Sequence, residues 1–253
     1  MSRIVLLGDS ITQGLGSQKV NFTSELEALR PDDEIINMAL TGTTIKYACD
    51  HVKDILAAKP DMVIILYGNV DAQIRPSRSG KIFRLLPSRF AHKDGSMLLP
   101  RPFYSKTFIK RLAQHIENFM RSFFRNLIYA VDGKEQWVDV DKFNNLYTWF
   151  CDELSKHNID IICCSTVYLD DDKFPGSNKE YIIFNSVIER ISQGNNKHFL
   201  DIYNPLKKLV SKYGWGNVYN YDHFHPKGYG YKYIAKWINE KIEEVKEPEC
   251  IED

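Results

Sequence analysis

Runs of apolar residues alternate with amphipathic segments along most of the chain. The apolar runs predict strands over residues 3–8, 34–39, 61–67, 159–167 and 198–202. The segments between and after them predict helices over residues 20–30, 44–58, 139–157, 180–192 and 227–246. Strands that alternate with crossover helices form parallel sheets with helices on both faces, so we expect an α/β fold.

Residues 72–138 break this alternation, because the segment is too long for an ordinary connection between a strand and the next helix. It contains four prolines and predicts a helix from about residue 105 to 129. We interpret it as a partly helical insertion after the third strand of a single domain that spans residues 1–253. The polar residues 247–253 predict a disordered tail.

The composition excludes several classes of protein. Thirty-three basic residues balance 33 acidic ones, which argues against a globally basic nucleic-acid binder. No apolar run reaches the length of a membrane span, and the first strand follows Met1 too closely for a signal peptide, so we expect a cytoplasmic protein. The five cysteines include the pair Cys163 and Cys164 in an apolar run, which predicts core thiols. Cysteine and histidine are not spaced as metal ligands, and we expect neither a metal nor a cofactor.

The insertion concentrates positive charge. Residues 72–125 contain twelve Lys and Arg against two acids, which favours an anionic partner. The predicted helix places an apolar stripe on one side, formed by Phe108, Leu112, Ile116, Phe119, Phe123 and Leu127. Such a stripe packs on the core or on a second copy of the chain as a homo-oligomer. A basic amphipathic helix can instead make a peripheral membrane contact.

Two short stretches carry candidate chemistry. In VLLGDSITQG, residues 5–14, a strand ends at Gly8 and is followed by Asp9 and Ser10, either as a cap of the next helix or as a nucleophile at a strand end. In NYDHFHPKGYGY, residues 220–231, Asp222 lies three residues before His225, either in a surface turn or as a carboxylate that orients a base. A serine nucleophile needs such a pair. His223 is a second candidate base.

Together, GDSIT near the start and DHFHP near the end resemble the SGNH/GDSL hydrolase family. The resemblance implies a flavodoxin-like three-layer α/β/α sandwich with a central parallel sheet of about five strands. It implies Ser10 as nucleophile, Asp222 and His225 as the rest of the triad, and the backbone N–H groups of Ser10 and Gly42 as oxyanion donors.

The third block of the family departs in this chain. Where the family has an asparagine that donates to the oxyanion, the stretch from Gly68 to Asp71 has Val70, with Asn69 one position early. Asn69 is either a turn residue or, if a sharp turn at Gly68 redirects it, an oxyanion donor.

These features predict a serine ester hydrolase, an esterase or deacetylase that acts on an O-acylated small molecule, glycan or carrier-linked substrate. An O-acyltransferase that modifies a surface polysaccharide and a non-catalytic glycan-binding or assembly protein are the alternatives. We expect the insertion to cover the cleft of Ser10, with Asp9, Asp71 and Arg75 as substrate-binding residues. Three further arginines are expected to attract an anionic substrate, namely Arg78, Arg84 and Arg89.

Overall fold

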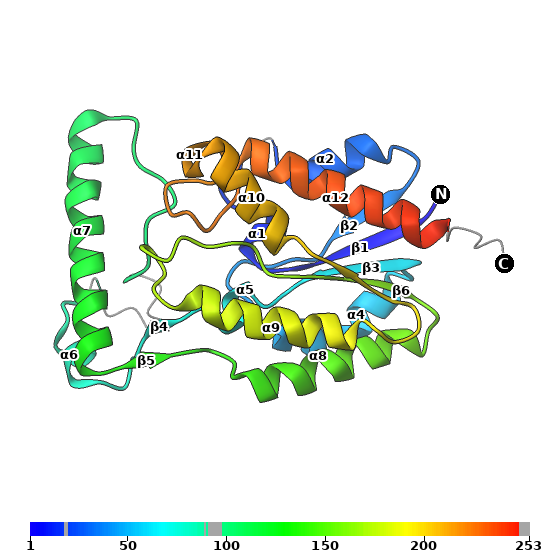
Figure 1. Cartoon of the computed structure of the whole chain (residues 1–253), viewed down its shortest axis with the longest axis horizontal. Coiled ribbons are helices and arrows are strands. Elements are labelled where there is room, and N and C mark those ends of the chain that lie inside the picture. The colour runs from blue at the N-terminus through cyan, green and yellow to red at the C-terminus, as the bar shows by residue number, and fades with distance from the viewer. Residues whose placement is uncertain (18–19, 89, 91–97, 248–253) are drawn as a thin grey trace.

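A sheet of five parallel strands forms the centre of the computed structural model, which describes residues 1–17, 20–88, 90 and 98–247 (Figure 1). The strand order is β2-β1-β3-β6-β7. The strands are β1 (Arg3–Gly8), β2 (Glu34–Asn37), β3 (Met62–Leu66), β6 (Asp160–Cys164) and β7 (Lys197–Leu200). The strand order reverses direction between β1 and β3, and ligands in such sheets bind beyond the carboxyl ends of the strands at this point.

Helices cover both faces of the sheet, as the alternation of elements predicts (Figure 1). One layer contains α2 (Phe22–Leu29), α10 (Tyr203–Tyr213), α11 (Trp215–Val218) and α12 (Gly228–Lys246). The other contains α3 (Ile45–Asp50), α4 (Val52–Ala57), α8 (Val140–Ser155) and α9 (Ser177–Ile191). The three-layer α/β/α fold is therefore confirmed.

Several details differ from the predicted elements. The helix expected over 44–58 is divided at His51 into α3 and α4. Helix α10 was not among the predicted elements. Its Pro205 lies in the first turn, where a missing N–H costs no intrahelical bond. Cys163 and Cys164 are buried as expected, Cys151 is buried as well, and burial raises the pKa of the Cys164 thiol.

The insertion projects from one end of the sheet (Figure 1). Two short antiparallel strands, β4 (Arg75–Pro76) and β5 (Lys134–Glu135), join its two ends. Between them lie α6 (Lys81–Leu85) and the long α7 (Phe108–Val131), which forms an outer edge of the molecule. The insertion has its own small apolar cluster, which contains Phe83, Leu86, Leu98 and Ile128.

The apolar stripe of α7 does not pack on the core, contrary to one of the two packing arrangements expected from the sequence. Phe108, Leu112, Ile116, Phe119 and Phe123 are all exposed, whereas Arg121 and Arg125 of the same helix are buried. In the described part of the chain, no helix is both long enough and apolar enough to cross a membrane. Most of the predicted tail, residues 248–253, lies outside the described residues.

Candidate active site

Ser10 lies directly after the carboxyl end of β1, in the first turn of α1 (Ser10–Gln13). A Cβ at Gly8 would lie 2.1 Å from Oγ1 of Thr12, so only glycine permits this close turn. The Asp9 carboxylate caps α1 by accepting a hydrogen bond from the Ile11 N–H at 2.9 Å. The Asp-Ser pair thus both caps a helix and places a hydroxyl at a strand end.

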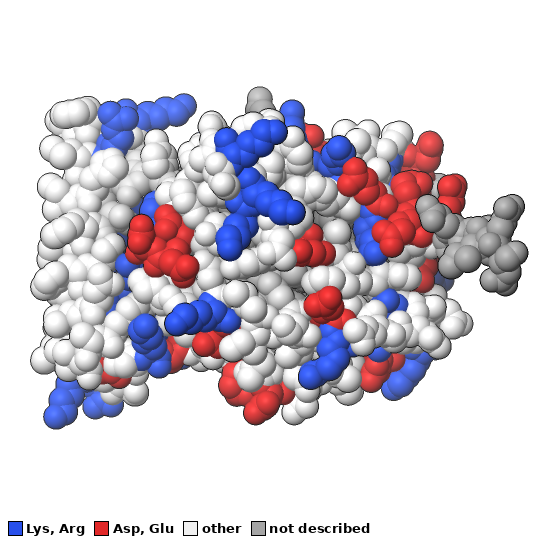
Figure 2. All heavy atoms as spheres, in the orientation of Figure 1, with Lys and Arg blue, Asp and Glu red and all other residues white. Residues whose placement is uncertain are grey.

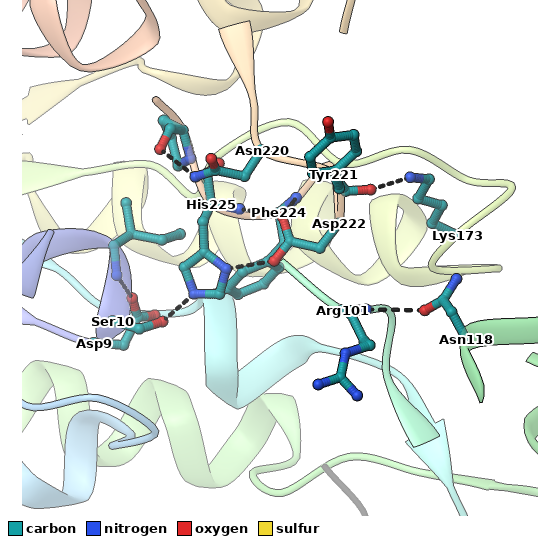
Figure 3. A network of polar contacts seen from close by, with 12 residues as sticks. Asp9, Ser10, Arg101, Asn118, Lys173, Asn220, Tyr221, Asp222, Phe224 and His225 are labelled. Atoms are coloured by element: carbon teal, nitrogen blue, oxygen red, sulfur yellow. Dashed lines mark hydrogen bonds and ion pairs between the residues drawn. The ribbon is translucent and has the colours of Figure 1, made fainter. Parts of the chain in front are cut away.

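The structure brings Ser10 together with the distant pair Asp222 and His225 (Figure 3). Oγ of Ser10 lies 2.8 Å from Nε2 of His225, and Nδ1 of His225 lies 2.5 Å from Oδ2 of Asp222. Because the ionised Asp222 carboxylate can only accept, Nδ1 carries the proton, and Nε2 is left to accept the hydrogen bond from the Ser10 hydroxyl.

The loop before α12 holds this pair by local hydrogen bonds. Oδ1 of Asp222 accepts from the N–H groups of Phe224 at 3.0 Å and His225 at 3.1 Å. The Asn220 N–H donates to the carbonyl of His225 at 2.9 Å, which closes the turn. Asp222 and His225 are both buried, so their relative position is fixed by the loop.

His223 does not compete with His225 for Ser10. Its φ of +55° turns the side chain away, its Nδ1 lies 2.5 Å from Oδ2 of Asp170, and its ring stacks on Trp215. Partial burial lowers the pKa of His223, partly offset by the hydrogen bond to Asp170.

The two residues expected to donate backbone N–H groups to an oxyanion, Ser10 and Gly42, line one cavity. The N–H of Ser10 belongs to the first turn of α1, where no intrahelical acceptor is available. Gly42 lines the same cavity as Ser10, and its φ of +76° is a conformation that favours glycine.

Asn69 does not supply a third donor in this structure. Gly68 does make a sharp turn, with φ of +113°, but Asn69 begins α5 (Asn69–Ala72) fully buried. Its side-chain oxygen accepts from the Val167 N–H at 2.9 Å, and its neighbour Val70 lines the cavity instead. Asn69 therefore joins the ends of β3 and β6, and of the two roles that the sequence left open these contacts favour the structural one over the oxyanion donor.

Asp9 and Asp71 are also structural residues, contrary to their expected role in substrate binding. Both are fully buried, and Asp71 accepts hydrogen bonds from the N–H groups of Ile45 and Gly68. Burial raises the pKa of Asp9 to about 6, against the hydrogen bond from Ile11. Burial likewise raises the pKa of Asp71 to about 7.

The third expected binding residue, Arg75, does line the cavity beside Ser10. The cavity has a volume of about 420 Å³. The Arg75 guanidinium lies 3.9 Å from the centroid of the Trp137 ring, and its Nη1 donates to the carbonyls of Val70 and Gln73. Arg75 is only 3% exposed, so it is held rigidly at the wall.

The insertion contributes further lining residues that were not among the predicted site residues. They are Gln73, Leu99, Pro100, Pro102, Arg121 and Trp137. The sequence signal that could have placed these residues at the cavity is their position in the insertion, because the insertion begins directly after β3. Arg78 and Arg84 are exposed and do not line the cavity, Arg78 instead pairing with Glu135, and Arg89 lies outside the described residues.

A second groove adjoins the catalytic cavity, with a volume of about 360 Å³. It shares Gly42 and Trp137 with that cavity. Its other lining residues are mostly polar: Thr43, Thr44, Lys46, Tyr47, Asp50, Val138 and Lys142. A ligand that leaves the catalytic cavity past Trp137 therefore meets hydroxyls, charges and an aromatic ring.

Comparisons with known proteins agree with this arrangement. The sequence profile of the GDSL-like Lipase/Acylhydrolase family matches residues 6–233. A search of curated protein sequences gives no significant match.

Solved structures share the fold at low sequence identity. A lipase/acylhydrolase from Enterococcus faecalis has a TM-score of 0.61 and 17% identity, over 96% of this chain and 95% of its own. A catalytic mutant of Axe2, an acetylxylan esterase from Geobacillus stearothermophilus, has a TM-score of 0.62 and 15% identity, over 95% and 94%. The acetyl xylan esterase AlAXEase has a TM-score of 0.60 and 16% identity, over 95% and 99%. Catalytic mutants of Axe2 replace a serine, a histidine and an aspartate.

Proposed function

Because the chain belongs to the GDSL-like Lipase/Acylhydrolase family, we propose that it hydrolyses acyl esters with Ser10 as nucleophile, His225 as base and Asp222 as the orienting carboxylate. The observation that carries this assignment is the continuous hydrogen-bonded relay from Ser10 through His225 to Asp222. Its members come from opposite ends of the chain and meet at the switch point of the sheet, where such folds bind ligands. The serine, histidine and aspartate of the Axe2 catalytic mutants support the same set.

The relay supports a two-step reaction. Oγ of Ser10 attacks the ester carbonyl while its proton passes to Nε2 of His225, and the N–H groups of Ser10 and Gly42 stabilise the oxyanion. The alcohol leaves with the proton from Nε2, which gives an acyl ester on Ser10. A water molecule then gives its proton to Nε2 of His225 and attacks the acyl ester. The bond between the acyl carbon and Oγ of Ser10 breaks, Nε2 returns the proton to Oγ, and the carboxylic acid is released.

The oxyanion site in this proposal rests on backbone donors alone. Val70 occupies the cavity wall at the position where the family has its asparagine. A side-chain oxyanion donor typically contributes on the order of 3 kcal/mol of transition-state stabilisation, so we expect modest turnover.

The cavity supports a short acyl group on a polar alcohol. Arg75 and Arg121 bring positive charge to its wall, and the one carboxylate among the described lining residues, Asp222, is hydrogen-bonded to His225. The adjoining groove past Trp137 offers polar groups and the Tyr47 ring to an extended, hydroxyl-rich alcohol. We therefore favour an O-acetylated glycan or carrier-linked sugar, in keeping with the named substrate of the acetylxylan esterases.

Replacing Ser10 with alanine tests the proposal. We expect Ser10→Ala to lower kcat/KM for a nitrophenyl acetate by about four orders of magnitude or more, and to abolish labelling by a fluorophosphonate. Ser186→Ala, which removes an exposed hydroxyl that bonds only to its own helix, controls for loss of a serine and should be neutral. Retention of a tenth of the activity in Ser10→Ala would exclude the assigned nucleophile.

A second assay separates hydrolysis from transfer. The enzyme is incubated with an acetyl donor, with and without a glycan acceptor, and free acetate and acetylated glycan are measured. Hydrolysis predicts acetate release that does not depend on the acceptor. Formation of acetylated glycan at the expense of acetate would show an acyltransferase instead.

A further inference from the structure

The long helix α7 presents its apolar side to solvent. We define its outer face by six residues that are 53% to 77% exposed: Phe108, Ile109, Leu112, Ile116, Phe119 and Phe123. The opposite side contacts the rest of the protein largely through polar groups, apart from Ile128, which lies in the small apolar cluster of the insertion. Arg125, for example, is 3% exposed and donates to the carbonyl of Lys173 at 2.6 Å. The helix is therefore inverted relative to an ordinary surface helix, whose apolar side faces the core.

This inversion is fixed by specific contacts. Glu117 lies on the inner side, where Oε1 accepts from Arg121 at 2.6 Å and from Arg101 at 2.8 Å. Asn118 accepts from the backbone N–H of Arg101 at 3.0 Å (Figure 3). Rotating α7 to bury its outer face would break these contacts and leave buried charges unpaired, so the exposure is a property of the folded protein.

Basic residues lie near both ends of α7. Lys106, Lys110 and Arg111 are exposed at its beginning, and Lys81 and Arg84 are exposed on α6, which packs against its end. Figure 2 shows the α7 edge as a pale strip with Lys and Arg near its two ends. Among the described residues from 72 to 131, the one acidic side chain is Glu117, and it is paired on the inner side.

This charge pattern opposes self-association through α7. In a two-fold dimer, the two helices run either parallel or antiparallel. A parallel pair would place each basic end against the same end of its partner, and an antiparallel pair would place Lys110 and Arg111 against Lys81 and Arg84. In both cases like charges meet around an apolar centre. The surface that complements an apolar centre with basic ends is a layer of anionic lipids.

We propose that the outer face of α7 docks on an anionic lipid surface, with its phenylalanine, leucine and isoleucine side chains in the acyl boundary and the flanking Lys and Arg at the headgroups. Long basic side chains reach the headgroups while their neighbours insert. The inner side of α7 contributes Arg121 to the catalytic cavity, so docking would hold that cavity close to the lipid headgroups. The proposal is independent of the catalytic assignment.

Vesicle flotation of the full chain tests docking. The probe is phosphatidylcholine vesicles with one-third phosphatidylglycerol, compared with phosphatidylcholine alone. We expect flotation with the anionic vesicles only, and less of it as salt rises. Lys110→Glu with Arg111→Glu should lower the bound fraction about tenfold or more. Lys53→Glu with Lys208→Glu, which makes the same charge change on α4 and α10, should bind as the unmodified chain does.

Two matched double variants test the contribution of the apolar side chains to vesicle binding. Ile116→Ser with Phe119→Ser should abolish flotation, whereas Ile182→Ser with Ile183→Ser, at exposed positions of α9, should not. Turnover of a soluble nitrophenyl ester should stay unchanged in all variants, because none of these residues lines the catalytic cavity. Absence of flotation, equal flotation with neutral vesicles, or equal loss in the control variants would overturn the proposal. A dimer in analytical ultracentrifugation that Ile116→Ser with Phe119→Ser dissociates, without vesicle binding, would show that a second copy covers this face.

Discussion

The buried carboxyl of Asp9 makes a quantitative prediction about stability and pH. Burial holds its pKa at about 6 in the folded protein, against the ordinary aspartate pKa of 3.8 that applies to the unfolded chain. Between these values the folded state keeps a proton that the unfolded state has lost, so stability falls as the pH rises through this window. The difference between a pKa of 3.8 and one of about 6 corresponds to about 3 kcal/mol of destabilisation above pH 7.

Asp9→Asn removes this titration and can still cap α1 through its side-chain oxygen. Relative to the unmodified chain, we expect the free energy of unfolding of the variant to rise by about 2 kcal/mol between pH 4.5 and pH 8, because part of the penalty is already present at pH 4.5. Urea unfolding at both pH values measures this difference, and any constant cost of the asparagine cancels in it.

Asp32→Asn, at an exposed position, controls for the loss of one carboxylate. If the stability difference between Asp9→Asn and the unmodified chain is the same at both pH values, Asp9 titrates alike in the folded and unfolded states. The description of Asp9 as a desolvated carboxyl would then be wrong.

Three further predictions concern catalysis. His225→Ala should lower kcat/KM by about four orders of magnitude, whereas His223→Ala, which loses a contact with Asp170, should cost far less; the reverse order in an ester assay would reassign the base. Asp222→Asn should lower kcat by about four orders of magnitude at unchanged folding by circular dichroism, because the asparagine amide favours the wrong His225 tautomer. Arg75→Met should raise KM for an acetylated uronate about tenfold and leave KM for an acetylated neutral sugar unchanged. Arg78→Met, which removes a surface arginine paired with Glu135, is the control. Equal effects on both esters would limit Arg75 to holding the turn at Val70.

Much of the architecture follows from local sequence. The apolar runs of β1 and β3 and the amphipathic segments between strands predict the parallel sheet, because burial on both faces requires continuous apolar strands. Because crossover connections between parallel strands are right-handed, only a few strand orders remain possible for these elements. Ser10 could be placed at a strand end because Gly8 marks where β1 stops, and Asp222 and His225 could be paired because three residues of a tight loop bring them together.

Side-chain direction depended on tertiary contacts. Asn69 points inward because the Val167 N–H at the end of β6 needs an acceptor, and no local pattern around Gly68 contains that information. His225 is selected over His223 because Asp170, more than fifty residues earlier, holds the latter.

In the insertion, too, local sequence determined some features and tertiary contacts decided others. Its sequence predicts an amphipathic, basic helix from about residue 105 to 129, close to the observed Phe108–Val131, because periodicity and charge are local properties. Only the tertiary structure decided that the polar side faces inward, because Glu117, Arg101 and Arg121 form ion pairs there, and the buried Arg125 bonds the carbonyl of Lys173. Hydrophobic patterning identifies the two sides of a helix, but which side is buried depends on what the rest of the fold offers as a partner.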